Sequence, residues 1–136
     1  MSKLQSKKKP APLAVKRKPL LLLLVLGALY FGHAQEIPEA FKEKAERIVE
    51  MRPKTYLVLN TELKTETGDT TLLRYFANLS KEAKYLEGES YALDQIGATY
   101  RNFSKYKAAV DLHQEALQLA EKANNVELKV RCLNML

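Results

Sequence analysis

The chain repeats itself with a period of 40 residues, and this self-similarity constrains the fold more than any other feature of the sequence. Leu79-Ser80-Lys81-Glu82-Ala83 aligns with Leu119-Ala120-Glu121-Lys122-Ala123 without a gap. The same register pairs Leu86 with Val126, Leu93 with Leu133 and Ile96 with Leu136. A pair of helices cannot bury its apolar face alone, so neighbouring repeats must stack. The period therefore predicts an all-α fold, a solenoid of antiparallel helix pairs.

Apolar residues recur at helical spacing through residues 36–136. We expect helices over 36–51, 71–84, 89–102 and 105–122, and another from 126 onward. The short apolar run at 56–59 could be a strand or a buried helix, and its helical neighbourhood favours a helix. Pro53 ends the first helix, because proline lacks an amide donor. Asp69 or Thr70 is placed to cap the helix over 71–84, and Ser104 the helix over 105–122.

Residues 92–117 identify the type of repeat. They read Ala92-Leu93-x-x-Ile96-Gly97-x-x-Tyr100, then Tyr106-x-x-Ala109, then His113-x-x-Ala116-Leu117. This pattern resembles the tetratricopeptide repeat. The resemblance implies that eight of these residues form the packing signature, with Gly97 allowing the paired helix to approach closely. The signature residues are Leu93, Ile96, Gly97, Tyr100, Tyr106, Ala109, Ala116 and Leu117.

Three departures from the family pattern accompany the match. Ser104 stands where glycine is usual before the second helix, and His113 stands where an aromatic residue is usual. The usual proline at the end of the repeat is missing, and a longer connection over 121–126 gives 40 residues instead of 34. We interpret His113 as a residue that fills the core or a groove.

The register divides the chain into five segments: a leader (1–34), a helical cap or degenerate first repeat (35–68), the second helix of a partial repeat (69–88), a complete repeat (89–125) and the start of a further repeat (126–136). Because the last segment stops mid-repeat, we expect an unpaired apolar face at Val130, Leu133 and Leu136. We therefore expect the sequence to be the N-terminal piece of a longer protein, the alternative being a short product whose last helix frays or dimerises.

The leader has the layout of a secretory signal peptide. Two basic clusters precede an apolar run over 20–31, and Gly32-His33-Ala34 supplies small residues before Gln35. Twelve helical residues span about 18 Å, against about 30 Å of hydrocarbon in a bilayer. We expect cleavage after Ala34 and an exported, periplasmic or otherwise extracytoplasmic protein. An uncleaved membrane anchor is the alternative.

The positive charge of the chain belongs to the leader. The whole chain carries +6, from 22 Lys and Arg against 16 Asp and Glu. Residues 1–34 hold seven cations and no acid, and 22 minus seven leaves 15 cations against 16 anions for the rest. We therefore expect no nucleic-acid partner for residues 35–136, and membrane contact only through the leader or a later membrane helix.

Few residues suited to catalysis or metal binding are present. The chain has one cysteine and two histidines, and the histidines, His33 and His113, lie far apart in the sequence. A disulfide framework or a cysteine-based zinc site is excluded by this count. We predict no catalytic residue, no metal and no cofactor, and we interpret Cys132 as a small core residue.

The resemblance implies a non-enzymatic scaffold that binds a protein or peptide. In such repeats the first helix of each pair lines a concave surface. The candidate binding residues on that helix, expected to be exposed, are Tyr91, Asp94, Ala98, Arg101 and Asn102. Repeats behind a signal peptide also resemble the sensor regions of bacterial membrane regulators, with a histidine kinase or helix-turn-helix output domain later in the chain. The rival reading is a free-standing exported adaptor without an output domain.

Overall fold

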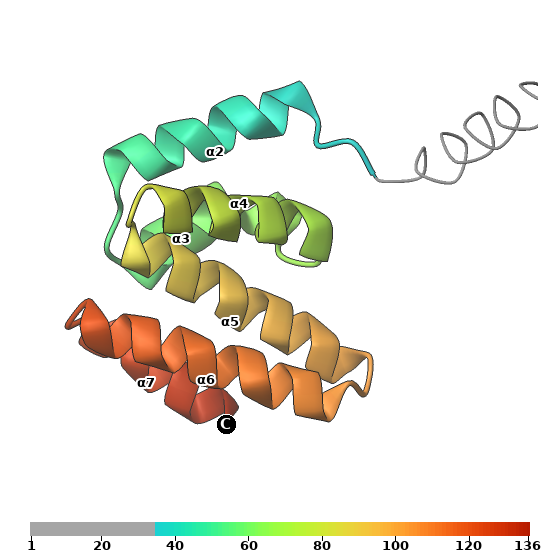
Figure 1. Cartoon of the computed structure of the whole chain (residues 1–136), viewed down its shortest axis with the longest axis vertical. Helices are drawn as coiled ribbons and strands as arrows, with labels where there is room; N and C mark the ends of the chain where they lie inside the picture. Colours follow the sequence, from blue (N-terminus) through green and yellow to red (C-terminus); the bar gives the residue numbers. More distant parts are fainter. Residues whose placement is uncertain (1–34) are drawn as a thin grey trace, which may run out of the picture. The chain divides into compact units, whose positions relative to one another are not determined.

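The computed structural model describes residues 35–136, and these are all-helical, with no strand among them (Figure 1). The leader predicted over 1–34 lies outside the described residues. Six α-helices and one short 3-10 turn follow one another in this part of the chain. They are α2 (Glu39–Met51), α3 (Tyr56–Glu62), η2 (Lys64–Glu66), α4 (Thr70–Glu82), α5 (Leu86–Asn102), α6 (Tyr106–Lys122) and α7 (Val126–Met135).

Helices α2 and α3 follow the expected pattern. The buried face of α2 consists of Phe41, Ala45, Ile48 and Val49, which are spaced three to four residues apart. The helix ends where Arg52 takes a left-handed conformation just before proline. The short helix predicted at 56–59 is confirmed, and the side chain of Thr55 accepts a hydrogen bond at its start.

Helix α4 begins at the predicted cap. The Asp69 carboxylate accepts hydrogen bonds from the amides of Thr71 and Leu72, at 2.9 and 3.0 Å. These bonds satisfy two of the free amide donors of the first helical turn. Inside the same helix, Leu73 and Phe76 are fully buried.

Three helix ends, spaced 20 residues apart, close in the same way. Lys84, Ser104 and Asn124 each take a left-handed conformation, with φ of 55°, 59° and 53°. At each position the amide of the next residue donates to a carbonyl five residues back, which is a Schellman closure. The pairs are Tyr85 to Ser80 (2.8 Å), Lys105 to Tyr100 (2.9 Å) and Asn125 to Ala120 (2.9 Å).

Two sequence predictions about these helix ends are wrong. Helix α5 begins at Leu86, not at Glu89, because the closure at Lys84 already turns the chain into the next helix. Ser104 is not the cap of α6: the N-cap is Lys105, without a side-chain hydrogen bond. Its left-handed conformation instead makes Ser104 the residue that terminates α5, in the place where the family pattern has glycine.

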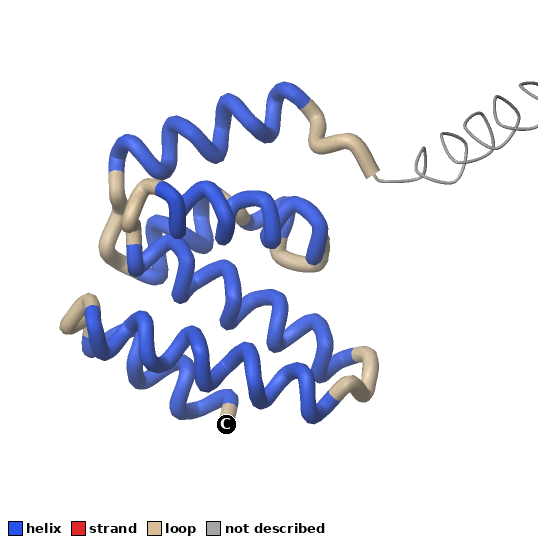
Figure 2. The backbone as a smooth tube through the Cα atoms, in the orientation of Figure 1, coloured by secondary structure: helices blue, strands red, loops and turns tan. Residues whose placement is uncertain are grey.

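The helices from α4 to α7 pack in sequence order, each against the one before it. Their connections alternate between the two ends of the helices, so successive helices run antiparallel (Figure 2). Helix α5 also contacts both α3 and α7, whereas α2 packs on α4. We call the face of α5 that meets α3 and α7 the inner face. The core centres on large apolar side chains of α2 to α5, among them Ile48, Phe76 and Ile96.

Most of the predicted packing signature lies in the interior. Leu93, Ile96, Gly97, Ala109 and Ala116 are buried, and the half-buried Tyr100 and Leu117 pack against the core. Tyr106 is the exception: 61% of its surface is exposed. It lies at the start of α6 and lines a recess together with Arg101, Val110 and the end of α7, so the predicted packing role is wrong for this residue.

Candidate functional site

The structure separates the five candidate binding residues into two groups. Arg101 and Asn102 are exposed at the end of α5, and Ala98 is half-buried. Tyr91 and Asp94 are only 1% and 4% exposed, so the expectation that they lie on an open surface is wrong. Their partners are far away in the sequence, which is why helical spacing alone did not reveal the burial.

Tyr91 is covered by α3. Its ring lies 5.6 Å from the ring of Tyr56, centroid to centroid, and its hydroxyl donates to Asn60 Oδ1 at 3.2 Å. Tyr56 donates its own hydroxyl to the same oxygen at 3.0 Å. Burial raises the pKa of the Tyr91 hydroxyl, so it stays protonated and acts as a donor.

A second set of contacts joins α3 and the residues before it to α7 and its cap. The Arg131 guanidinium lies 3.3 Å from the centroid of the Tyr56 ring, a cation–π contact. Glu127 accepts the backbone amide of Tyr56 at 3.1 Å, and the Asn125 side-chain amide donates to the carbonyl of Lys54 at 2.6 Å. Residues 54–56 are thus held by three side chains of α7 and its cap, about 70 positions later in the chain.

Asp94 pairs with His113 on α6. Nδ1 of His113 lies 2.8 Å from Asp94 Oδ1, and both side chains are buried. The carboxylate only accepts, so Nδ1 carries the hydrogen of this bond. The interpretation of His113 as an interior residue is confirmed. Nε2 finds no hydrogen-bond partner among the described residues.

Gly97 provides the space for this imidazole. A Cβ atom at position 97 would lie 2.8 Å from Cε1 and 2.9 Å from Nε2 of His113. The glycine of the packing signature is therefore required by a specific side chain on α6. The hydrogen bond between Asp94 and His113, together with the space that Gly97 leaves for the imidazole, makes one contact between α5 and α6.

Cys132 lies next to this contact and is buried, as predicted. Burial, with Asp94 adding to it, raises the pKa of the Cys132 thiol to about 12. The thiol stays protonated at neutral pH, which makes it a poor nucleophile. Ser90 donates its hydroxyl to the carbonyl of Ala116 at 2.7 Å, so this hydroxyl holds α6. Asp94, His113, Ser90 and Cys132 are residue types that also occur in catalytic groups. Here the hydrogen bonds of Asp94 and Ser90 join α5 to α6.

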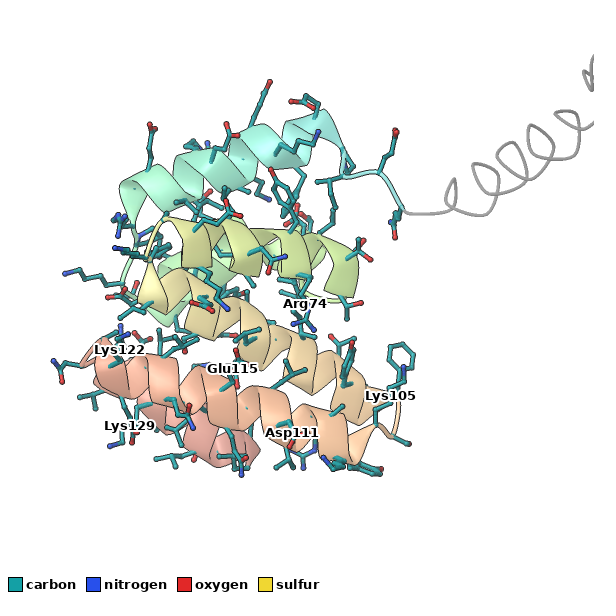
Figure 3. All side chains as sticks on the ribbon, viewed as in Figure 1. Arg74, Lys105, Asp111, Glu115, Lys122 and Lys129 are labelled. Atoms are coloured by element: carbon teal, nitrogen blue, oxygen red, sulfur yellow. The ribbon has the colours of Figure 1, made fainter. Side chains whose placement is uncertain are left out.

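A recess with a volume of about 720 Å³ lies between α4, α5 and α6. Glu89 lies in it, 7% exposed, and burial raises the pKa of its carboxyl group. Lysine side chains line the recess on both sides, from Lys81 on α4 and Lys122 on α6. Figure 3 shows Glu115 and Lys122 on α6, on the side of the molecule that faces the viewer. The mixture of both charges favours no single class of ligand.

A smaller recess of about 240 Å³ lies between the start of α6 and the end of α7, lined by Arg101, Tyr106 and His113 among others. The apolar face predicted to be unpaired is exposed nearby, at Val130, Leu133 and Leu136.

No helix within residues 35–136 is long and apolar enough to cross a membrane. In the same part of the chain, no group of three or more His, Cys, Asp or Glu side chains is arranged around a metal position.

Comparison with protein families, with curated proteins and with solved structures finds no match for this chain. The case for a function therefore rests on the repeat pattern and on the contacts of the inner face.

Proposed function

We propose that residues 36–136 form a solenoid of tetratricopeptide-like repeats that serves as a non-enzymatic scaffold for a protein or peptide partner. The observation that carries the proposal is the recurrence of one helix closure at Lys84, Ser104 and Asn124, in step with the 40-residue sequence repeat. Repeated helices joined by identical turns are the basis of an α-solenoid. Such arrays present extended surfaces and bind partners through them.

The proposal includes export. The leader over 1–34 has the charge and apolar pattern of a signal peptide, so the scaffold would act outside the cytoplasm. Mass spectrometry of the processed protein tests this part, since the proposal requires Gln35 to be its first residue. An intact leader on the protein would contradict cleavage.

Site-specific photocrosslinking tests the scaffold. A photoreactive amino acid replaces Arg101, the exposed inner-face candidate, in the full chain in its source cells. The matched control replaces Asp111, an exposed residue on α6. We expect a discrete protein adduct from position 101 and none from position 111. Equal adducts from both positions, or none from position 101, would contradict the proposed binding surface.

A further inference from the structure

Residues 54–56 are gripped by four side chains of α5, α7 and the cap of α7, which we call the clamp. The clamp consists of Tyr91, Asn125, Glu127 and Arg131. It grips the segment by a backbone carbonyl (Lys54), a backbone amide (Tyr56) and the aromatic ring of Tyr56. A carbonyl, an amide and an aromatic side chain within three residues are what any peptide with a suitably placed tyrosine offers.

We propose that the clamp binds a tyrosine-containing peptide of a partner protein, and that Tyr56 is an internal competitor that must leave first. The proposal rests on the proposed function, because it names the chemistry that the scaffold would recognise. The contacts made by residues 54–56 define the partner segment: a tyrosine whose amide reaches Glu127 and whose ring stacks on Arg131.

The internal occupant satisfies the clamp incompletely. Nε of Arg131 is buried and has no hydrogen-bond partner among the described residues, although its guanidinium stacks on Tyr56. A buried donor without an acceptor weakens the assembly that contains it. A partner peptide that adds a carbonyl or carboxylate oxygen at this point would bind the clamp better than residues 54–56 do.

The first turn of α3 is weakly held apart from these contacts. Helix α3 has seven residues, and Leu59 is the only one of them that is buried. Leu57, next to Tyr56, is 70% exposed. Because short helices have little stability of their own, fraying of the first turn frees Tyr56 while Leu59 keeps the rest of α3 in the core. An internal competitor lowers the apparent affinity for a partner by the fraction of molecules whose clamp is free.

The test measures binding of a labelled peptide with the sequence of residues 52–62 to the full chain by fluorescence anisotropy. Tyr56→Ala removes the aromatic ring of the internal competitor and leaves its two backbone contacts, which weakens its hold on the clamp. Leu57→Ala is the matched control in the same turn. We expect the Tyr56→Ala protein to bind the peptide at least tenfold more tightly than the wild type or the Leu57→Ala protein. Adding Arg131→Ala to the Tyr56→Ala chain, or replacing the tyrosine of the peptide by alanine, should remove the gain.

Equal affinity for the Tyr56→Ala and Leu57→Ala proteins would overturn the proposal, as would binding that ignores the tyrosine of the peptide. Should Tyr56→Ala lose helicity by circular dichroism, Tyr56→Leu keeps the apolar volume without the aromatic ring, and at least threefold tighter binding is expected. In the wild type, saturating peptide should speed amide exchange over 55–58 and leave α5 unchanged; no change would count against displacement.

Two outcomes separate this proposal from others. Dimers of the wild type that vanish in the Tyr56→Ala protein would show that a second copy fills the clamp, which overturns the proposed external partner. Adducts from position 101 that are insensitive to Tyr56→Ala, together with no gain in peptide binding, would leave the scaffold standing and remove the clamp from it.

Discussion

Replacing Gly97 with alanine tests the contact that sets the distance between α5 and α6. The added Cβ would approach Cε1 and Nε2 of His113 to 2.8 and 2.9 Å, closer than side-chain atoms pack. The imidazole has little freedom to move aside, because Nδ1 is bonded to the buried Asp94 at 2.8 Å. Overpacking of this kind costs about 1–3 kcal/mol. Alanine returns about 1 kcal/mol through its higher helix propensity. The net loss expected for Gly97→Ala is therefore about 0–2 kcal/mol.

A double-mutant cycle separates these two opposing effects. His113→Asn keeps a donor toward Asp94 and removes Cε1 and Nε2, the two ring atoms closest to position 97; the donor, which replaces Nδ1 at 3.0 Å from the added Cβ, stays. In that background Gly97→Ala should be neutral or stabilising by up to about 1 kcal/mol. The coupling free energy between positions 97 and 113 should then be about 1–3 kcal/mol. Urea unfolding, followed by circular dichroism, measures all four proteins.

Gly68→Ala is the matched glycine control, because a Cβ at position 68 meets no atom within 4 Å and the residue has no left-handed conformation. Its effect should stay within about 0.5 kcal/mol. The reasoning is refuted if Gly97→Ala destabilises the His113→Asn protein as much as the wild type. Such a result would mean that the backbone at Gly97, not the space beside it, is what the fold requires.

Three further predictions follow from the same helices. Ser104→Gly should stabilise the protein by about 0.5–1 kcal/mol in urea unfolding, because glycine adopts the left-handed conformation without a clash between Cβ and the backbone. Ser104→Ala keeps the Cβ and should bring no gain in stability. Asp94→Ala should cost about 1–3 kcal/mol, because it leaves the buried Nδ1–H of His113 without an acceptor. Asp94→Asn, whose amide oxygen still accepts from His113, should cost clearly less; equal melting temperatures for the two variants would contradict the pairing. Stability should fall as pH rises above about 9. The folded pKa of Cys132, raised to about 12, exceeds its unfolded value, so only the unfolded thiol ionises in that window. Cys132→Ala should flatten the fall in stability between pH 9 and 10 in thermal melts.

The helices could be predicted from spacing within single segments, whereas the burial of the candidate binding residues depends on contacts between distant parts of the chain. The Asp69 cap, the buried face of α2 and the interior placement of Leu93, Ile96 and Ala116 all follow from spacing within a single helix. The burial of Tyr91 depends on Asn60 and Tyr56, which lie more than 30 positions earlier, and no periodicity encodes that approach. The left-handed turn at Ser104 was missed because serine is a common cap, and its role as a helix terminator depends on the carbonyls of α5.

The pairing of Asp94 with His113 explains two irregularities of the sequence at once. The resemblance places an aromatic residue at position 113 and leaves 94 as an ordinary exposed position of the first helix. A histidine there brings a polar ring into the α5–α6 contact, and a buried polar ring needs a partner. Asp94 supplies the acceptor at 2.8 Å, and Gly97 supplies the room. Because a single polar contact fixes the axial register of two helices more narrowly than alanine surfaces do, the three residues act as one unit. The effect of changing one of them should therefore depend on the other two.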